Sequence, residues 1–379
     1  MTDKFDDIRP YSEEEALERF SQVIDNESFI NAMRKYIPDY TLEQLQEDAR
    51  HFNTIYDFQY AISRRFIEKF VEKTTGGVSY SGIENIDKNK CYLYIGNHRD
   101  ITFDAALLAE YFFLNQYNTP KIAIGDNLVS SRFLAEVGML NKMFIVKRSV
   151  SLREKITNYQ HLAAYIHNVL FSEHESVWIA QRDGRTKDGL DITKQGLVKM
   201  LAMDDQQKAM DVLKRINLTP LSISYEYEPC DKLKARELAL SEEGPYHKKQ
   251  GEDFESIIQG IMGYKGRVQL TIGKTIVEEL NHIPEELNQN EKIYKVCKLV
   301  DQQIYRNYKL FPNNYIAFDL IDGSNTFTDK YNQEEKEHFL SYIDKQSIVE
   351  DVPKEKMKHY LLRIYANPVT TSLNIKYRE

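Results

Sequence analysis

Asn97 and His98 are the residues whose types and position most clearly suggest chemistry. They follow the apolar run Cys91–Ile95, so a strand would deliver a histidine into a turn. A histidine with a pKa of about 6.5 is the usual general base at neutral pH. A carboxylate on its second ring nitrogen fixes the tautomer and stabilises the imidazolium, and Asp100 and Asp104 both follow closely. The sequence therefore predicts a histidine base with an aspartate partner.

The two aspartates differ in what their positions suggest. Asp100 stands where the N-cap of the next helix belongs, and its side chain would accept hydrogen bonds from the N–H of Thr102 or Phe103. Asp104 falls in the first helical turn and can face back toward the end of the strand. We prefer Asp104 as the partner of His98 and keep Asp100 as the alternative.

Two basic loops follow later strands in a chain that is acidic overall. Lys147 and Arg148 come after the run Met143–Val146, and a second loop comes after Val177–Ala180. That second loop contains Arg182, Asp183, Gly184, Arg185 and Lys187. The guanidinium fork binds phosphate bidentately, and glycine lets the backbone approach a ligand closely. Two such loops beside a histidine predict an anion site, most simply for phosphate.

A sheet must bring these strand ends together. Short apolar runs alternate with helical patterns through the middle of the chain, which predicts an α/β fold with a sheet covered on both faces. Sites in such sheets lie beyond the carboxyl ends of the strands. The predicted strands are Cys91–Ile95, Lys121–Ile124, Met143–Val146, Val177–Ala180, Leu218–Tyr225 and Arg267–Ile272.

Helical patterns flank this region on both sides. Capping boxes at Ser12 with Glu15 and at Thr41 with Gln44 indicate helix starts near the N-terminus. We predict an N-terminal helical region over residues 1–80, an α/β domain over 81–285 and a C-terminal helical extension over 286–379.

Composition excludes several classes of protein. The 379 residues include 50 basic and 58 acidic side chains, for a net charge of −8, which disfavours nucleic-acid binding. Three scattered cysteines exclude a disulfide framework and fit a reducing compartment. The longest apolar stretch, Ala105–Leu114, is shorter than the ~20 residues of a membrane span. We expect a cytoplasmic protein, soluble or peripheral.

Four blocks in this order resemble the glycerolipid acyltransferase superfamily, which includes lysophosphatidate and glycerol-3-phosphate acyltransferases. The resemblance covers about residues 83–275. The matching blocks are Asn97-His98 with Asp104, Gly138 with Phe144 to Arg148, Arg182-Asp183-Gly184-Arg185, and Thr219-Pro220-Leu221.

The resemblance implies an acyltransferase-type mixed sheet flanked by helices, and transfer of a fatty acyl group from a thioester to a hydroxyl. The donor would be acyl-CoA or acyl-carrier protein, and the acceptor a glycerol phosphate or a lysophospholipid. His98 would be the base, with no metal and no cofactor beyond the donor. The substrate-binding residues would be Asn97, Arg148, Asp183, Gly184, Arg185 and Lys187, with Asp183 orienting the acceptor hydroxyl.

This sequence departs from the family pattern in two places. Five residues instead of four separate His98 from Asp104, which keeps Asp100 open, and Asp183 replaces the usual glutamate. Two alternatives therefore stand: an O-acyltransferase for a non-phosphate acceptor such as an amino-acid lipid, or an inactive lipid-binding scaffold.

Other signals are weaker. Gly260, Gly263 and Gly266 precede a strand instead of following one, which argues against a dinucleotide site. The basic segment Lys147–Lys155 is a candidate docking face for an acidic carrier protein. Lipid substrates would imply peripheral contact with the inner face of the cell membrane. The helix Phe58–Val71 has the composition of a membrane-surface helix, although packing on its own domain is the preferred interpretation.

Overall fold

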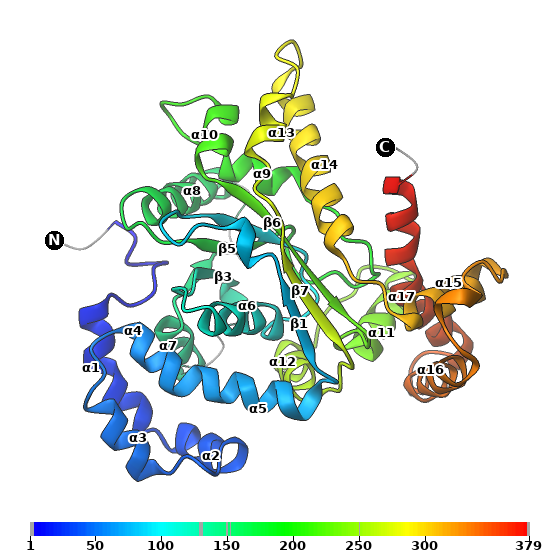
Figure 1. Cartoon of the computed structure of the whole chain (residues 1–379), viewed down its shortest axis with the longest axis horizontal. Helices are drawn as coiled ribbons and strands as arrows, with labels where there is room; N and C mark the ends of the chain where they lie inside the picture. Colours follow the sequence, from blue (N-terminus) through cyan, green and yellow to red (C-terminus); the bar gives the residue numbers. More distant parts are fainter. Residues whose placement is uncertain (1–3, 129–131, 149–150, 152, 250, 377–379) are drawn as a thin grey trace.

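A seven-stranded mixed sheet with helices on both faces forms the centre of the molecule (Figure 1). The computed structural model describes residues 4–128, 132–148, 151, 153–249 and 251–376. The strands run in the order β1-β7-β6-β2-β5-β3-β4. Their bounds are β1 Val78–Ser81, β2 Leu93–Gly96, β3 Lys121–Gly125, β4 Met143–Val146, β5 Val177–Ala180, β6 Leu218–Tyr225 and β7 Val268–Ile272. The predicted α/β fold is confirmed.

Five strands, from β6 to β4, are parallel, and β7 pairs antiparallel with β6 and parallel with β1. Every residue of β2 and β6 is buried, as expected for central strands covered on both faces. All six predicted runs form strands. Sequence analysis missed β1, a four-residue edge strand whose residues are only half-buried or exposed.

The helices divide between the two faces of the sheet. One face carries α8 Lys155–Phe171, α9 Gln195–Leu201, α10 Ala209–Arg215, α13 Val277–Asn281 and α14 Gln289–Asn307. The other carries α5 Arg64–Thr74 and α6 Phe103–Leu114. On this second face Leu107 and Leu108 of α6 are fully buried against the strands.

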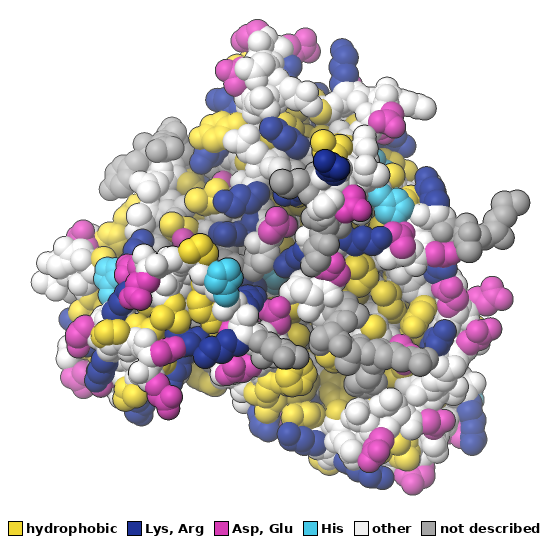
Figure 2. Space-filling model, turned by 180° about the vertical axis from the view of Figure 1, so that it is seen from behind, with side chains coloured by type: hydrophobic (Ala, Val, Ile, Leu, Met, Phe, Trp, Pro, Cys, Tyr) yellow, Lys and Arg dark blue, Asp and Glu magenta, His cyan; other side chains and the backbone are white. Residues whose placement is uncertain are grey.

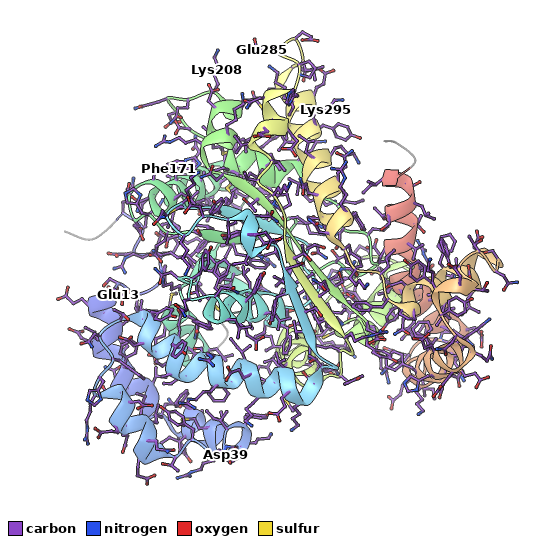
Figure 3. The ribbon with its side chains drawn as sticks, in the orientation of Figure 1. Glu13, Asp39, Phe171, Lys208, Glu285 and Lys295 are labelled. Carbon is purple, nitrogen blue, oxygen red and sulfur yellow. The ribbon has the colours of Figure 1, made fainter. Side chains whose placement is uncertain are left out.

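The N-terminal helices form a core of their own. They are α1 Glu13–Ile24, α2 Glu27–Tyr36, α3 Leu42–Ala49 and α4 Ile55–Phe58, and α7 Arg132–Leu140 packs against them. The predicted capping boxes at the starts of α1 and α3 are confirmed. In Figure 3 the labelled Glu13 and Asp39 mark this end, and Lys208, Glu285 and Lys295 mark the opposite end of the molecule.

The remaining helices lie beyond the carboxyl ends of the parallel strands. They are α11 Asp231–Ser241, α12 Glu252–Met262, α15 Pro312–Asp322, α16 Gln333–Gln346 and α17 Lys354–Lys376. Phe339 of α16 and Leu361 of α17 are fully buried in a core that α11 shares. Across the described residues, no helix combines the length and the hydropathy that crossing a bilayer requires.

Candidate active site

The turn between β2 and α6 carries the histidine. Nδ1 of His98 lies 2.9 Å from Oδ2 of Asp104, which also accepts hydrogen bonds from the N–H of Arg99 at 2.7 Å and of Asp100 at 3.0 Å. A carboxylate oxygen that receives two backbone N–H groups acts as an acceptor, so Nδ1 of His98 is the donor. The other ring nitrogen, Nε2, is then unprotonated and free to accept a proton.

Tyr225, the last residue of β6, completes the surroundings of this carboxylate. Its hydroxyl donates a 2.7 Å hydrogen bond to Oδ1 of Asp104. Burial and the charge of Asp104 raise the pKa of Tyr225 well above its usual value, so the hydroxyl stays a donor. Sequence analysis did not select Tyr225. The signal was its position at the end of a strand parallel to β2, because such strand ends meet at one edge of the sheet.

Asp100 binds the start of α6 instead of contacting His98, and the N-cap position belongs to Thr102, two residues later than the sequence suggested. Its Oδ1 accepts hydrogen bonds from the N–H of Thr102 at 2.9 Å and of Phe103 at 2.7 Å. Its Oδ2 is buried without a hydrogen-bond partner among the described residues. A Cβ added at Gly260 of α12 would lie only 2.1 Å from that oxygen, so α12 packs directly on the turn that carries His98.

Asn97 is fully buried and joins β2 to β6. Its Oδ1 accepts from the N–H of Ile223 at 2.8 Å, and its Nδ2 donates to the carbonyl oxygen of Ile223 at 2.9 Å. Nδ2 also lies 3.1 Å from Oδ2 of Asp191. The structure therefore places Asn97 within the sheet, where it continues the strand pairing, and not on the wall of the cavity described below.

Arg99, the residue after His98, forms two buried ion pairs that hold the turn in place. Its guanidinium lies 2.6 Å from Asp191 and 3.0 Å from Glu228. Lys234 of α11 donates to Glu228 at 2.6 Å and to the backbone carbonyl of Arg99 at 2.7 Å. Tyr365 of α17 holds the same segment, because its hydroxyl accepts from the N–H of Glu228 at 3.0 Å. The C-terminal helices thus help to position the turn that carries the histidine.

A cavity of about 220 Å³ opens beside His98 at the carboxyl ends of the strands. Basic side chains from two loops and from the segment before α12 surround it. The structure therefore brings five predicted substrate-binding residues to one cavity with His98: Arg148, Asp183, Gly184, Arg185 and Lys187. Asn97, Asp100 and Asp104 do not line this cavity. Its lining includes His98, Asn127, Arg148, Arg182, Asp183, Gly184, Arg185, Lys187, Lys248 and Asp253.

The cations of this cavity fall into two groups. Lys187 pairs with Glu237, and Lys248 pairs with Asp253. The three arginines form no ion pair with any described residue. Nε of Arg182 and Nη1 of Arg185 are moreover buried N–H groups without a hydrogen-bond partner in the described part of the chain. Buried donors of this kind are costly unless a ligand satisfies them.

Two glycines make room for this arrangement. Gly184 has a φ of +69°, a left-handed conformation that favours glycine at the tip of the loop. A Cβ at Gly125, at the end of β3, would lie 2.7 Å from Nε of Arg148. Gly125 therefore provides the space in which the Arg148 side chain lies. Sequence analysis did not select Gly125, and it named Arg182 in the basic loop without including it among the substrate-binding residues.

A second cavity, of about 230 Å³, is lined almost entirely by apolar groups. Thr102 and Phe103, which directly follow the turn that carries His98, line it together with residues of α5 and α6. Ile261 of α12 borders it as well. Its other apolar lining residues include Phe66, Ile67, Phe70, Ala105, Ala106, Ala109, Phe113, Ile122, Val137 and Met143.

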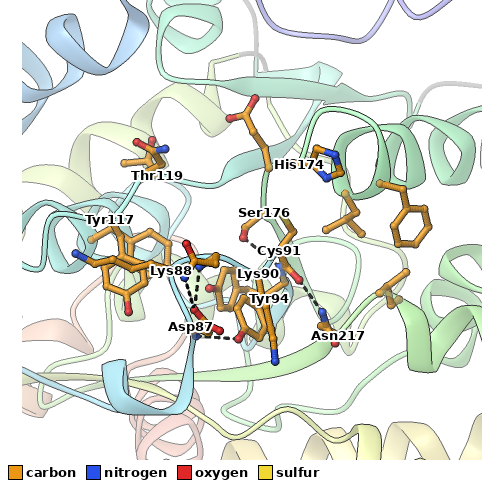
Figure 4. Close-up of a pocket in the computed structure, with 18 of the residues that line it drawn as sticks. Asp87, Lys88, Lys90, Cys91, Tyr94, Tyr117, Thr119, His174, Ser176 and Asn217 are labelled. Carbon is orange, nitrogen blue, oxygen red and sulfur yellow. Dashed lines mark hydrogen bonds between the residues drawn. The ribbon is translucent and has the colours of Figure 1, made fainter.

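A larger cavity, of about 430 Å³, lies at the opposite edge of the sheet. Figure 4 shows Cys91, Tyr94, Ser176 and Asn217 around it, where strands begin and where α6, α8 and α10 end. Ligand sites in parallel sheets lie instead at the carboxyl ends of strands. The predicted site residues, all of them described, lie at that other edge, so this cavity is separate from the histidine site.

Among the residues that the structure describes, no cluster of histidine, cysteine, aspartate and glutamate side chains is suited to hold a metal ion.

The segment Lys147–Lys155, predicted as a docking face, is described only in part. Lys147 of the predicted docking segment forms an ion pair with Asp7. Arg148 of the same segment lines the cavity beside His98. Residues 149, 150 and 152 of that segment lie outside the described residues.

Comparisons with a family model and with solved structures each found similar proteins. Residues 77–220 match the model of the Acyltransferase family. The 1-acyl-sn-glycerophosphate (LPA) acyltransferase PlsC from Thermotoga maritima aligns with 76% of this chain and 95% of its own length, at 14% sequence identity and a TM-score of 0.36. A search of curated proteins found no significant match. The matched segment contains the His98–Asp104 pair, Arg148, Arg182 and Arg185, so these residues lie in the part of the chain that is similar to the Acyltransferase family.

Proposed function

We propose that this protein transfers a fatty acyl group from an acyl thioester to a hydroxyl of a phosphate-bearing glycerolipid acceptor. One observation carries the proposal. The oriented His98–Asp104 pair lines a cavity in which two arginines hold buried, unpartnered N–H groups. A base beside a cluster of arginine side chains is the arrangement that acylation of a phosphorylated alcohol requires.

The reaction assigns one role to each ring nitrogen. Nε2 of His98 takes the proton of the acceptor hydroxyl while the oxygen attacks the thioester carbonyl and forms the new C–O bond. Asp104 stabilises the resulting imidazolium through Nδ1. The tetrahedral intermediate collapses, the C–S bond breaks, and the thiolate leaves with the proton held by His98. Every proton and electron pair is accounted for without a further reactant.

In this proposal the acceptor and the acyl chain bind in two different cavities. Arg148, Arg182 and Arg185 bind the phosphate of the acceptor, and Asp183 at the cavity wall orients its hydroxyl. The apolar cavity between α5 and α6 receives the acyl chain of the donor, because Thr102 and Phe103, which follow the turn that carries His98, line it.

The test is acceptor-dependent thiol release by the purified protein. Palmitoyl-CoA and palmitoyl-carrier protein are offered in turn, each with glycerol 3-phosphate, lysophosphatidate, or the matching acceptors without phosphate. We expect release with a phosphorylated acceptor and its loss in His98→Ala. Arg185→Gln should raise the acceptor KM about tenfold or more, because a charge-assisted contact is worth about 1.5–3 kcal/mol. Arg50→Gln, at an exposed arginine of the N-terminal region, is the matched control.

Three results would contradict the proposal. Equal rates with phosphorylated and unphosphorylated acceptors would favour a non-phosphate acceptor such as an amino-acid lipid. An acceptor KM unchanged by Arg185→Gln would remove the phosphate site. Release that His98→Ala leaves intact would remove His98 as the base, and no release with any pair would favour the inactive lipid-binding scaffold.

A further inference from the structure

Asp191 is a buried carboxylate that contacts both neighbours of His98. Its Oδ2 accepts a hydrogen bond from Nδ2 of Asn97 at 3.1 Å, and from Nη2 and Nε of Arg99 at 2.6 Å and 3.1 Å. Asn97 precedes His98 and Arg99 follows it, so one carboxylate oxygen holds the chain on both sides of the base. Asp191 is 1% exposed, and hydrogen bonds to a buried charge are strong.

The other oxygen of the same carboxylate holds the basic loop. Oδ1 of Asp191 accepts a 2.6 Å hydrogen bond from the hydroxyl of Thr186, which is fully buried and directly follows Arg185. The N–H of Thr186 donates in turn to the carbonyl oxygen of His98 at 2.7 Å. The base and the loop that carries the arginine are therefore joined twice, once directly and once through Asp191.

Two helices fix the part of the loop that carries this carboxylate. The N–H of Asp191 donates to the hydroxyl of Tyr305 in α14 at 2.8 Å. Nδ2 of Asn367 in α17 donates to the carbonyl oxygen of Asp188 at 2.6 Å. Loop residues that are tied to helices in this way can hold a site in one geometry.

The placement of the arginines matters because the protein is not basic as a whole. The chain has a net charge of −8, and on the face shown in Figure 2 the Lys and Arg side chains are interspersed with Asp and Glu. A phosphate therefore depends on individual cations that stand at the right place. Arg185 is one of them, because it lines the cavity beside His98 and its Nη1 is buried without a partner among the described residues.

We propose that Asp191 is a positioning residue that sets the distance between the base His98 and the phosphate-binding Arg185. This role rests on the proposed acyl transfer. Oδ2 holds the two neighbours of the base, and Oδ1 holds Thr186 beside the arginine. An acceptor hydroxyl reaches Nε2 of the base only if the bound phosphate lies at the matching distance, so one carboxylate serves both binding and proton transfer.

The first experiment removes the Oδ1 contact alone. Thr186→Val deletes the hydroxyl, keeps the shape of the side chain and leaves the backbone bond to His98 in place. Isothermal titration calorimetry with glycerol 3-phosphate, without an acyl donor, should show binding about fivefold weaker or more. Thr193→Val removes another buried hydroxyl of the same loop, which donates to Gln181, and is the matched control that should bind as the wild type does. Thr186→Ser keeps the hydroxyl and should bind normally.

A double-mutant cycle shows whether Thr186 acts through Arg185. In an Arg185→Gln background, Thr186→Val should weaken binding of glycerol 3-phosphate by less than about twofold, because the arginine that the contact positions is gone. These titrations involve no turnover. They therefore report the positioning of the anion site separately from acyl transfer.

Steady-state kinetics separate the two carboxylate oxygens. Thr186→Val should raise the acceptor KM and change kcat by less than about twofold, because the contacts of Oδ2 remain. Asp191→Asn also disturbs the contacts on both sides of His98, and kcat should fall by about a hundredfold. Circular dichroism checks that each variant is folded. If Asp191→Asn does not fold, the titrations of Thr186→Val still decide the proposal.

Four results would overturn the proposal. They are no binding of glycerol 3-phosphate by the wild type, unchanged binding by Thr186→Val, additive effects of Thr186→Val and Arg185→Gln, or a folded Asp191→Asn with the kcat of the wild type. A wild type that binds glycerol 3-phosphate, responds to these variants as expected and transfers no acyl group would contradict the proposed function alone.

Discussion

Tyr225 donates a 2.7 Å hydrogen bond to Oδ1 of Asp104, the carboxylate oxygen that His98 does not contact. The two donors therefore bind opposite oxygens of one carboxylate, and its plane is fixed from both sides. A carboxylate that cannot rotate holds the imidazole ring in one orientation. Tyr225 is a positioning residue, because it acts on the base only through Asp104.

Tyr225→Phe removes this hydrogen bond and little else. We expect kcat to fall about tenfold with acceptor KM nearly unchanged, because a hydrogen bond to a charged group contributes about 1.5–3 kcal/mol. Steady-state kinetics with the acceptor varied separates the two parameters. Tyr294→Phe, at an exposed tyrosine of α14, is the control. A purely structural role would instead lower the melting temperature and leave kcat of the folded enzyme intact.

Asp104→Asn and Asp100→Asn distinguish the two aspartates. Asparagine at 104 cannot stabilise the imidazolium, so we expect kcat to fall by about a thousandfold or more. The Oδ1 of an asparagine can accept the same two hydrogen bonds from the N–H of Thr102 and Phe103, so Asp100→Asn should keep most of the activity. Thiol release under saturating substrates measures both. The reverse order of effects would mean that the catalytic carboxylate has been misassigned.

Gly260→Ala should destabilise the protein. The added methyl group would lie 2.1 Å from Oδ2 of Asp100, and relieving that overlap requires the helix or the turn to move. We expect a loss of about 1–3 kcal/mol in the free energy of unfolding. Urea denaturation measures it against Gly196→Ala in α9, where a Cβ has open space and alanine should be neutral or stabilising. Equal effects of the two variants would contradict the close packing of α12 on the turn.

Asp231 gives the stability a pH dependence of known sign. Burial raises its pKa from 3.8 to about 6, against hydrogen bonds from Tyr365 and Tyr342 that lower it. The folded state therefore binds the proton more tightly than the unfolded state. Its contribution is complete below pH 3.8 and is lost as the pH rises through about 6.

The difference in unfolding free energy between wild type and Asp231→Asn should therefore fall by roughly 3 kcal/mol from about pH 4 to about pH 7. Urea titrations across this range measure the difference, with exposed Asp25→Asn as the reference that should show no such trend. A constant difference would mean that Asp231 is not protonated in the folded protein.

Local patterns predicted much of the fold and part of the site. The strand runs were readable because strands buried on both faces exclude charged residues, and β2 and β6 are buried throughout and contain none. The preference for Asp104 over Asp100 followed from turn and capping geometry, which depends on neighbouring residues alone. The structure brings exactly this pair within hydrogen-bond distance.

Long-range relationships were beyond such patterns. Arg99 and Asp191 pair across more than ninety positions, and no local spacing connects them. Helix α12 exposes Phe254 and Ile258 and buries Ser256 and Gly260. The periodicity of a sequence does not say whether an apolar helix face turns inward or outward. Asn97 illustrates the same gap, because only the register of β2 with β6 shows that its amide continues the strand pairing.

The link from Arg99 through Glu228 to Tyr365 has a consequence for synthesis of the chain. Tyr365 belongs to the last helix, and Asn367 beside it donates to the carbonyl oxygen of Asp188 in the basic loop. During translation, the histidine, the arginines and the sheet all emerge before α17 does. The hydrogen bonds of Tyr365 and Asn367 can form only after α17 has left the ribosome. A chain that still lacks α17 therefore also lacks these two contacts, one to the segment that holds Arg99 and one to the basic loop.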